Sequence, residues 1–451
     1  MKIDDLKNKK IAILWFWKEG RSSLSFLQSL WISDITILDK EISEWIEKIS
    51  GINYISWNRY LSDLSKYDYI IKSPGISPFH KKIAEVKHKL ISQTQIFSEN
   101  YTGKIIWITG TKGKSTVATL LYTMLKAAWY DTVLVWNIWA PVLDEIDLLS
   151  HEVHDFVVYE MSSYMLQDFI PNLYIWYFNN VYPCHLDWHT SLEIYKNAKK
   201  NIVKWATISV IQEEFKEEFS EINKKNIIYF DGDQKYKYIE AGFYIWNELV
   251  FWTDEIWLKW EHNKKNILGV ITILDVILQD SKNISKLLHD ILPKFKGLPH
   301  RIEIIGEYEW IIFVDDAIAT TPESTIAAIK SFDWPIQTLF LGWEDSWFDF
   351  KTIRETILRS NIQNIIGFPD TSEKIFPEIL HRDYEVPFEM EIDGMILQFL
   401  KTRSMKSWVD FAYKTTFPGR VALLSCAAPS FSLWKNYIEK ANEFRKEVVS
   451  Y

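Results

Sequence analysis

The chain has little glycine and little cysteine, and it contains no long apolar run. Its 451 residues include 15 glycines and only two cysteines, Cys184 and Cys426. Two cysteines cannot build a disulfide framework, which fits a reducing compartment. No apolar run reaches the roughly 18 residues that a membrane-spanning helix needs, and the apolar segment 11–17 is too short for a signal peptide. We therefore expect a cytoplasmic protein without membrane insertion.

Size and charge restrict the chain further. Its formal net charge of −9 argues against non-specific binding to nucleic acid, which favours basic surfaces. A hydrophobic content of 47% is sufficient for substantial cores, and 451 residues predict two or three domains.

Tryptophan is as abundant as glycine is scarce. The 22 tryptophans outnumber the 15 glycines, although glycine ordinarily makes up about 7% of a protein. With glycine at Trp15 and Trp17, the segment 15–20 would read G-x-G-x-x-G between an apolar run and a helical pattern, as in a phosphate-approach turn. Further tryptophans in such loops are Trp136 and Trp139, which bracket Asn137-Ile138, and Trp343 and Trp347, which flank an acidic loop.

These loops need positive φ or close backbone approach, which suits glycine. Our hypothesis is that the source organism reads UGA as glycine and that UGA is translated as tryptophan in this sequence. Recoding of about 15 positions would restore glycine to about 7%. The alternative is a genuinely tryptophan-rich protein.

The segment 109–115 reads Thr109-Gly110-Thr111-Lys112-Gly113-Lys114-Ser115. It lies between an apolar run at 104–108, which predicts a buried strand, and a helical pattern at 116–128. A strand, a glycine turn and a helix start direct backbone N–H groups at phosphate oxygens. Lys114 would then reach the β- and γ-phosphates and Ser115 would ligate Mg²⁺. Ile108 replaces the first glycine of the general motif, and a lysine-rich surface turn is the alternative interpretation.

Alternation of short apolar runs with helical patterns predicts an α/β fold of three domains, at 1–100, 101–298 and 299–451. The expected strands are 10–14, 34–38, 53–55 and 69–71, then 104–108, 156–159 and 173–178, then 310–314, 338–341, 364–366 and 421–424.

Further motifs make the chain similar to the Mur ligase family. They are Glu160-Met161-Ser162-Ser163, the loop 179–189 with its Asn179-Asn180 start, Gly297-Leu298-Pro299-His300-Arg301, and the segment 316–321 that begins Asp316-Ala317. The resemblance runs nearly end to end. It implies a Rossmann-like UDP-binding domain at 1–100, a P-loop ATPase-like domain at 101–298, and a Rossmann-like, amino-acid-binding domain at 299–451.

The resemblance also implies an activity. Members form amide bonds in peptidoglycan precursor synthesis, using ATP to make an acyl phosphate. Within the family, the chain is most similar to members that add D-glutamate to UDP-N-acetylmuramoyl-L-alanine. It implies ATP and two Mg²⁺ ions as cofactors, and we expect a monomer. A sister ligase adding another amino acid stays open, as does an inactive nucleotide-binding scaffold if the tryptophans are genuine.

The resemblance assigns roles to residues as well. Catalytic roles fall on Lys114, His185 and Lys199, the last as a carbamate. Mg²⁺ ligands would be Ser115, Glu160, His185 and Lys199. The nucleotide would meet Gly110, Thr111, Lys112, Gly113, Lys114, Ser115, Thr116, His262, Asn263, Arg301 and Asp316. The other substrates would meet Asp39, Ser73, Gly75, Asn137, Ser162, Thr320, Ser430 and Tyr437.

Some of these assignments have rivals, and the chain departs from the family pattern in places. Lys199 could be a plain surface lysine, and Asp39 a turn residue. The departures are Cys184 before His185, Ala317 and Ile318 in the segment 316–321, and Ser346 in place of a basic residue. Lys435 could supply the positive charge missing at Ser346.

Overall fold

The computed structural model divides the chain into two compact units, Met1–Lys294 and Phe295–Tyr451. It describes residues 2–451 except 41–48, 50, 137–140, 151, 167–172, 182–185, 190, 201–202, 204, 222–225, 233–234, 254–260, 296, 333–334, 344–349, 429–433 and 435. Among the helices in those ranges, none combines the length and the apolar character needed to cross a bilayer.

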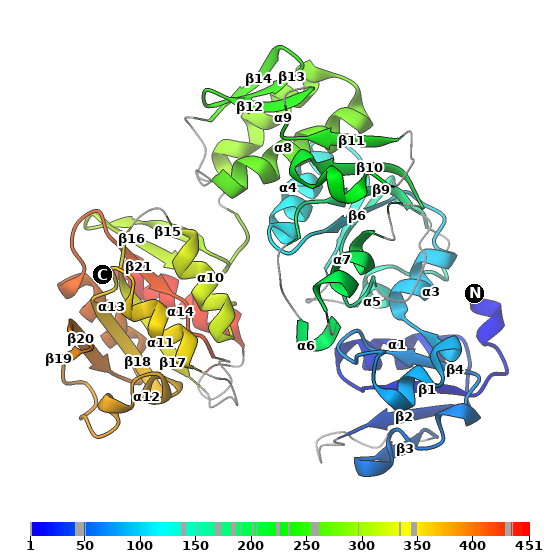
Figure 1. Ribbon diagram of the computed structural model, residues 1–451, viewed down its shortest axis with the longest axis horizontal. Coiled ribbons are helices and arrows are strands. Elements are labelled where there is room, and N and C mark those ends of the chain that lie inside the picture. Colours follow the sequence, from blue (N-terminus) through cyan, green and yellow to red (C-terminus); the bar gives the residue numbers. More distant parts are fainter. Residues whose placement is uncertain are drawn as a thin grey trace. The chain divides into compact units, whose positions relative to one another are not determined.

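The first unit begins with a five-stranded parallel sheet in the order β3-β2-β1-β4-β5 (Figure 1). The strands at the centre of the sheet are largely apolar and buried, whereas β3 at one edge is more exposed. Their bounds are β1 Ile11–Leu14, β2 Ile35–Asp39, β3 Asn53–Ser56, β4 Tyr69–Lys72 and β5 Leu90–Ile91, with helices α1 Lys18–Ser29, α2 Lys81–Ala84 and α3 Gln93–Asn100.

A second, six-stranded parallel sheet follows in the order β11-β10-β9-β6-β8-β7. Because β6 lies between β9 and β8, the carboxyl ends of these three strands adjoin, which is where open parallel sheets bind ligands. The strands are β6 Ile105–Thr109, β7 Thr132–Val135, β8 Phe156–Glu160, β9 Leu173–Phe178, β10 Ala206–Gln212 and β11 Ile227–Phe230. The helices are α4 Lys114–Ala127, α5 Val142–Glu145, α6 Leu186–His189, α7 Leu192–Lys200, α8 Glu261–Leu278 and α9 Ser281–Ile291.

A small antiparallel sheet completes the first unit. It consists of β12 Tyr236–Ile239, β13 Gly242–Ile245 and β14 Glu248–Trp252. α9 packs against β14, and α8 against β12.

The second unit is built on one seven-stranded sheet in the order β15-β16-β21-β17-β18-β20-β19. Five strands form a parallel centre, and antiparallel hairpins add β15 and β19 at the two edges. The strands are β15 Glu303–Tyr308, β16 Ile311–Asp315, β17 Ile336–Trp343, β18 Asn364–Asp370, β19 Phe388–Ile392, β20 Met395–Lys401 and β21 Val421–Leu424. The helices are α10 Pro322–Ser331, α11 Lys351–Leu358, α12 Thr371–Ile375, α13 Met405–Thr415 and α14 Tyr437–Ser450.

The unit boundary lies near the one expected at 298, whereas the division expected at 100 falls inside the first unit. The first two sheets share one hydrophobic core there. Stacked and edge-on rings join α3 to the second sheet: Phe97 contacts Tyr159 with centroids 5.8 Å apart, and Tyr159 stacks on Trp107 at 4.9 Å. The three-domain division stays a prediction.

The tryptophans fall into distinct conformational classes. Trp107, Trp176, Trp188, Trp408 and Trp434 are buried. Six others have positive φ and are 40–95% exposed, namely Trp15, Trp31, Trp57, Trp129, Trp246 and Trp310.

The tryptophans that the sequence predicted at glycine positions only partly coincide with the tryptophans that have positive φ. Trp15 has φ +76°, but Trp17 has φ −92°, which any residue adopts. Trp136 and Trp343 are not among the described residues with positive φ, and Trp139 and Trp347 lie outside the described residues.

Candidate nucleotide-binding site

A strand, a glycine loop and a helix start form the expected phosphate loop. β6 ends at Thr109, and Gly113 caps α4 with φ +78°. A Cβ at Gly113 would lie 2.4 Å from Asn266 Oδ1, so glycine is required for both conformation and space. The backbone N–H groups and the dipole at the start of α4 favour an anion.

Asn180, which follows β9, holds the loop in shape. Its Oδ1 accepts hydrogen bonds from Thr111 N at 3.0 Å and from Lys112 N at 2.8 Å. Its Nδ2 donates to Lys112 O at 3.1 Å, and its backbone oxygen accepts from Thr111 N at 2.9 Å. One side chain therefore braces two consecutive residues of the loop.

A second layer of amides lies behind this brace. Asn179 Nδ2 donates to Lys112 O at 3.0 Å and to Asn266 Oδ1 at 2.8 Å. Tyr177 OH donates to Asn179 Oδ1 at 2.9 Å, which orients this amide. Asn266, on α8, donates to Asn263 Oδ1 at 3.2 Å. The predicted nucleotide residue Asn263 is thus buried and connected to the loop through Asn266.

Two lysines contact the loop backbone. Lys114, the first residue of α4, donates from Nζ to Thr111 O at 3.2 Å. Lys199 on α7 is 1% exposed, and its Nζ donates to Thr109 Oγ1 at 3.0 Å and Gly110 O at 3.1 Å. This burial contradicts the surface-lysine interpretation of Lys199.

The expected Mg²⁺ ligands lie partly within the described residues. Ser115 is buried in the first turn of α4, and Thr116 beside it is half-buried. Glu160 ends β8, is buried, and pairs in register with Ile108 of β6. A carboxylate and a hydroxyl near the phosphate loop are hard oxygen ligands that suit Mg²⁺. His185 lies outside the described residues, as do Asn137 and Ser430.

The expected substrate residues of the first sheet gather around Trp15. Asp39, at the end of β2, accepts a hydrogen bond from Phe16 N at 2.7 Å. Ser73 Oγ donates to Trp15 O at 3.1 Å, and the Trp15 indole covers Gly75, whose added Cβ would lie 2.0 Å from the ring. Asp39 therefore braces the loop after β1, and its contact with the UDP portion stays a prediction.

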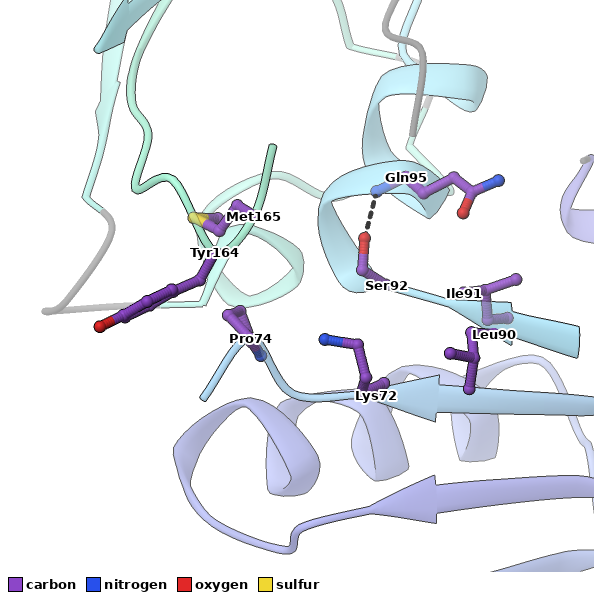
Figure 2. Close-up of a pocket in the computed structure, with 8 residues that line it drawn as sticks. All are labelled: Lys72, Pro74, Leu90, Ile91, Ser92, Gln95, Tyr164 and Met165. Carbon is purple, nitrogen blue, oxygen red and sulfur yellow. Dashed lines mark hydrogen bonds between the residues drawn. The ribbon is translucent and has the colours of Figure 1, made fainter. Parts of the chain in front are cut away.

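A pocket lies beside this edge (Figure 2). Its lining includes Lys72 and Pro74 from β4 and the following turn, and Tyr164 and Met165 from the segment after β8. The other lining residues are Leu90, Ile91, Ser92 and Gln95. The expected acceptor residue Ser162 is in the same segment, and its Oγ accepts from Met165 N at 3.4 Å.

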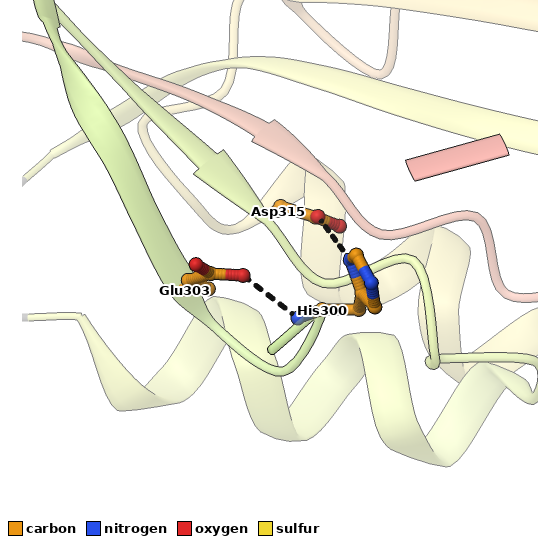
Figure 3. A group of neighbouring side chains, drawn as sticks. All are labelled: His300, Glu303 and Asp315. Carbon is orange, nitrogen blue, oxygen red and sulfur yellow. Dashed lines mark hydrogen bonds and ion pairs between the residues drawn. The ribbon is translucent and has the colours of Figure 1, made fainter. Parts of the chain in front are cut away.

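The second unit carries its own polar cluster (Figure 3). His300 Nδ1 lies 2.8 Å from Asp315 Oδ2, and His300 N donates to Glu303 Oε2 at 2.9 Å. Arg301 is exposed next to this anchored histidine. The three side chains could hold a metal ion, but their contacts already form a hydrogen bond between His300 and Asp315 and a loop anchor.

Asp316 lies at the centre of a buried network. Its carboxylate accepts from Ser425 Oγ at 2.8 Å and from Ile302 N at 3.2 Å. Burial raises its pKa to about 7. Thr320 is half-buried in the loop that follows, and Tyr437 begins α14 with its ring 6.0 Å from that of His300.

Parallel sheets with a braced phosphate loop at the end of β6 define a P-loop nucleotide-binding α/β protein. Residues 108–273 match the Mur ligase middle domain. Over this region the chain is similar to the Mur ligase family.

Two curated relatives illustrate the similarity in sequence. UDP-N-acetylmuramoylalanine--D-glutamate ligase of Clostridium tetani is 29% identical, with 97% of this chain and 96% of the relative covered. The ligase of the same name from Acetivibrio thermocellus is 28% identical, with 99% and 97% covered.

Solved structures support the fold. The MurF ligase of Thermotoga maritima in complex with ADP is 15% identical, has a TM-score of 0.51, and covers 98% of this chain and 95% of its own. A pseudomurein peptide ligase type C from Methanothermus fervidus has a TM-score of 0.52 at 15% identity, with 98% and 100% covered.

Sequence reasoning did not identify Asn180 and Asn266 as contacts of the loop. The available signal was the Asn179-Asn180 pair directly after the apolar run 173–178, because polar residues at the carboxyl end of a parallel strand face the ligand edge. For Asn266 there was no local signal, since α8 is distant in sequence.

Proposed function

We propose that the chain is an ATP-dependent ligase that joins D-glutamate to UDP-N-acetylmuramoyl-L-alanine in peptidoglycan precursor synthesis. The main support for this proposal is the phosphate loop braced by Asn180, in a chain that aligns almost end to end with D-glutamate ligases. A carboxylate is a poor electrophile, so ATP transfers its γ-phosphoryl group to the carboxylate oxygen and ADP leaves. The amine then attacks the acyl carbon, and phosphate leaves.

Lys114 and the amides at the start of α4 stabilise the transferring phosphoryl group. Positioning and charge neutralisation supply most of the rate in phosphoryl transfer. Lys114 Nζ is held near the loop by its contact with Thr111 O. Asn180 fixes the loop on which this geometry depends.

Ser115 and Glu160 would hold Mg²⁺, with His185 and a carbamate of Lys199 as further ligands or ligand-orienting groups. When bound, the ion neutralises phosphate and carboxylate charge. The amine of Lys199 donates hydrogen bonds in its present form and cannot ligate a cation. Carbamylation would turn this donor into an anion at the same place.

The resemblance assigns the remaining contacts with the nucleotide and the other substrates to several parts of the chain. Asp39, Ser73 and Gly75 would form the edge for the UDP portion, and Ser162 beside the Figure 2 pocket would meet the acyl acceptor. Asn263, Arg301 and Asp316 would contact the nucleotide, and Thr320 and Tyr437 the amino acid. We expect the working enzyme to be a cytoplasmic monomer.

The test is release of phosphate from ATP in the presence of UDP-N-acetylmuramoyl-L-alanine and D-glutamate. Release should require both substrates, and Lys114→Ala should lower it by at least two orders of magnitude, as expected for a group that stabilises developing charge. Lys126→Ala, an exposed lysine in the last turn of the same helix, is the matched control. Equal release with L-glutamate or another amino acid would assign a different substrate.

A further inference from the structure

We propose that Trp15, Trp31, Trp57, Trp129, Trp246 and Trp310 are glycines in the protein that its own cells make. Each has φ between +55° and +76°. Only a few per cent of non-glycine residues have positive φ, so 22 tryptophans would contribute about one such residue. Six occur in the described part of the chain, and all six indoles are exposed.

Trp31 and Trp129, two of these six residues, lie at the C-terminal ends of helices, at the position where glycine is the usual residue. After α1, Trp31 N donates to Gln28 O at 2.9 Å and Ile32 N to Leu27 O at 3.1 Å. This pair of bonds is the Schellman motif, with Trp31 at its left-handed position.

The end of α4 repeats the pattern. Trp129 N donates to Lys126 O at 3.1 Å and Tyr130 N to Leu125 O at 3.1 Å. Trp31 and Trp129 are 94% and 95% exposed, so neither indole has packing that could offset the backbone strain. Two independent helix ends therefore select glycine.

Two more occur in two-residue hairpin loops. Glu309 and Trp310 connect β15 to β16 with φ of +48° and +64°, the type I′ conformation, in which the second residue is typically glycine. The hairpin of β19 and β20 has the same conformation and uses Asp393-Gly394. Trp246 is the first residue of the loop between β13 and β14, the glycine position of a type II′ turn.

Other tryptophans in the chain are genuine by the same physical criteria. The Trp188 indole is buried, and its Nε1 donates to Gly75 O at 3.2 Å. The Trp434 indole is buried and donates to the Glu443 carboxylate. A buried indole with a satisfied N–H cannot be exchanged for glycine without a cavity. A mixture of UGG and UGA codons accounts for both classes.

Trp15 lies at the edge of the first sheet where Ser73 and Gly75 are proposed to bind the UDP portion of the substrate. The inference about Trp15 therefore rests on the proposed function. Trp15 follows the carboxyl end of β1, and its indole lies on Gly75, close to Ser73. Glycine at this position would uncover the backbone of Gly75 and of the loop after β1. An anionic group such as a diphosphate could then approach these amides.

The recoding can be tested without reference to activity. The protein is purified from the source organism's own cells, and its peptides are analysed by mass spectrometry. Peptides that contain positions 31 and 129 should have the mass for glycine, and peptides with Trp188 and Trp434 should have the mass for tryptophan. Tryptophan at both 31 and 129 would overturn the proposal.

A binding measurement tests the part that concerns Trp15. Recombinant Trp15→Gly should bind uridine diphosphate at least tenfold more tightly than the unchanged chain in calorimetry. Trp57→Gly, which also removes an exposed indole at positive φ, is the control and should leave the affinity unchanged. Equal affinity in all three proteins would refute the blocking role of Trp15, whereas the mass result stands independently of any ligand.

Discussion

Replacing Asn180 by alanine should loosen the phosphate loop and weaken ATP binding. The side chain makes hydrogen bonds with Thr111 N, Lys112 N and Lys112 O. Each such bond contributes about 1 kcal/mol net, which gives about 3 kcal/mol if all three are lost without replacement. Lys112 is exposed and Thr111 half-buried, so water can satisfy part of the loss.

We therefore expect a net cost of about 1.5–2 kcal/mol, which corresponds to roughly ten- to thirtyfold weaker ATP binding. Isothermal titration calorimetry with ATP and Mg²⁺ measures this change, and thermal melting checks that the fold is intact. Asn226→Ala is the matched control, because Asn226 is exposed and donates one hydrogen bond to Thr207 O, outside the loop.

A second variant separates shape from charge. Asn180→Asp keeps two acceptor interactions but loses the donor to Lys112 O, and it adds a negative charge beside the expected phosphate. Its ATP affinity should fall further than that of the alanine variant at low salt, and the difference should shrink as salt screens the charge. ATP affinity within twofold of the parent for both variants would refute the bracing role of Asn180.

Three other changes test separate parts of the molecule. Lys199→Ala should lose ligation and regain part of it with added short carboxylic acids, whereas Lys200→Ala should stay active; full activity of Lys199→Ala without additive would count against the carbamate. The pKa of Asp316 is raised from 3.8 to about 7, so its contribution to the free energy of unfolding falls as pH rises through that interval, by up to about 4 kcal/mol. Urea midpoints at pH 5 and pH 8 should therefore differ less for Asp316→Asn than for the parent, and identical differences would contradict this. Trp31→Gly and Trp129→Gly together should raise the unfolding temperature, because relief of left-handed strain, about 1–2 kcal/mol per residue, exceeds the entropic cost of glycine, about 0.5–1 kcal/mol; a lower temperature would show that the indoles stabilise the chain.

Much of the fold could be predicted from local sequence. The runs at 156–159, 175–178 and 421–424 are apolar and buried, so apolar continuity alone indicated parallel strands. The edge hairpins of the second unit were not predicted from the sequence. In the hairpin of β19 and β20, exposed residues interrupt the apolar runs, so neither strand stands out as a continuous apolar segment.

The candidate site divides in the same way. Gly113, Lys114 and Ser115 form a motif of consecutive residues whose geometry follows from a strand, a turn and a helix start, so the sequence by itself determined the phosphate loop. Only the tertiary structure placed Asn180 and Asn266 on that loop and buried Lys199 beneath it, since these residues come from the segment after β9, from α8 and from α7. The excess of tryptophan over glycine was likewise visible in composition. Which tryptophans occupy glycine positions depends on φ at helix ends and hairpins, and backbone conformation is set by the packing of the elements that each turn connects.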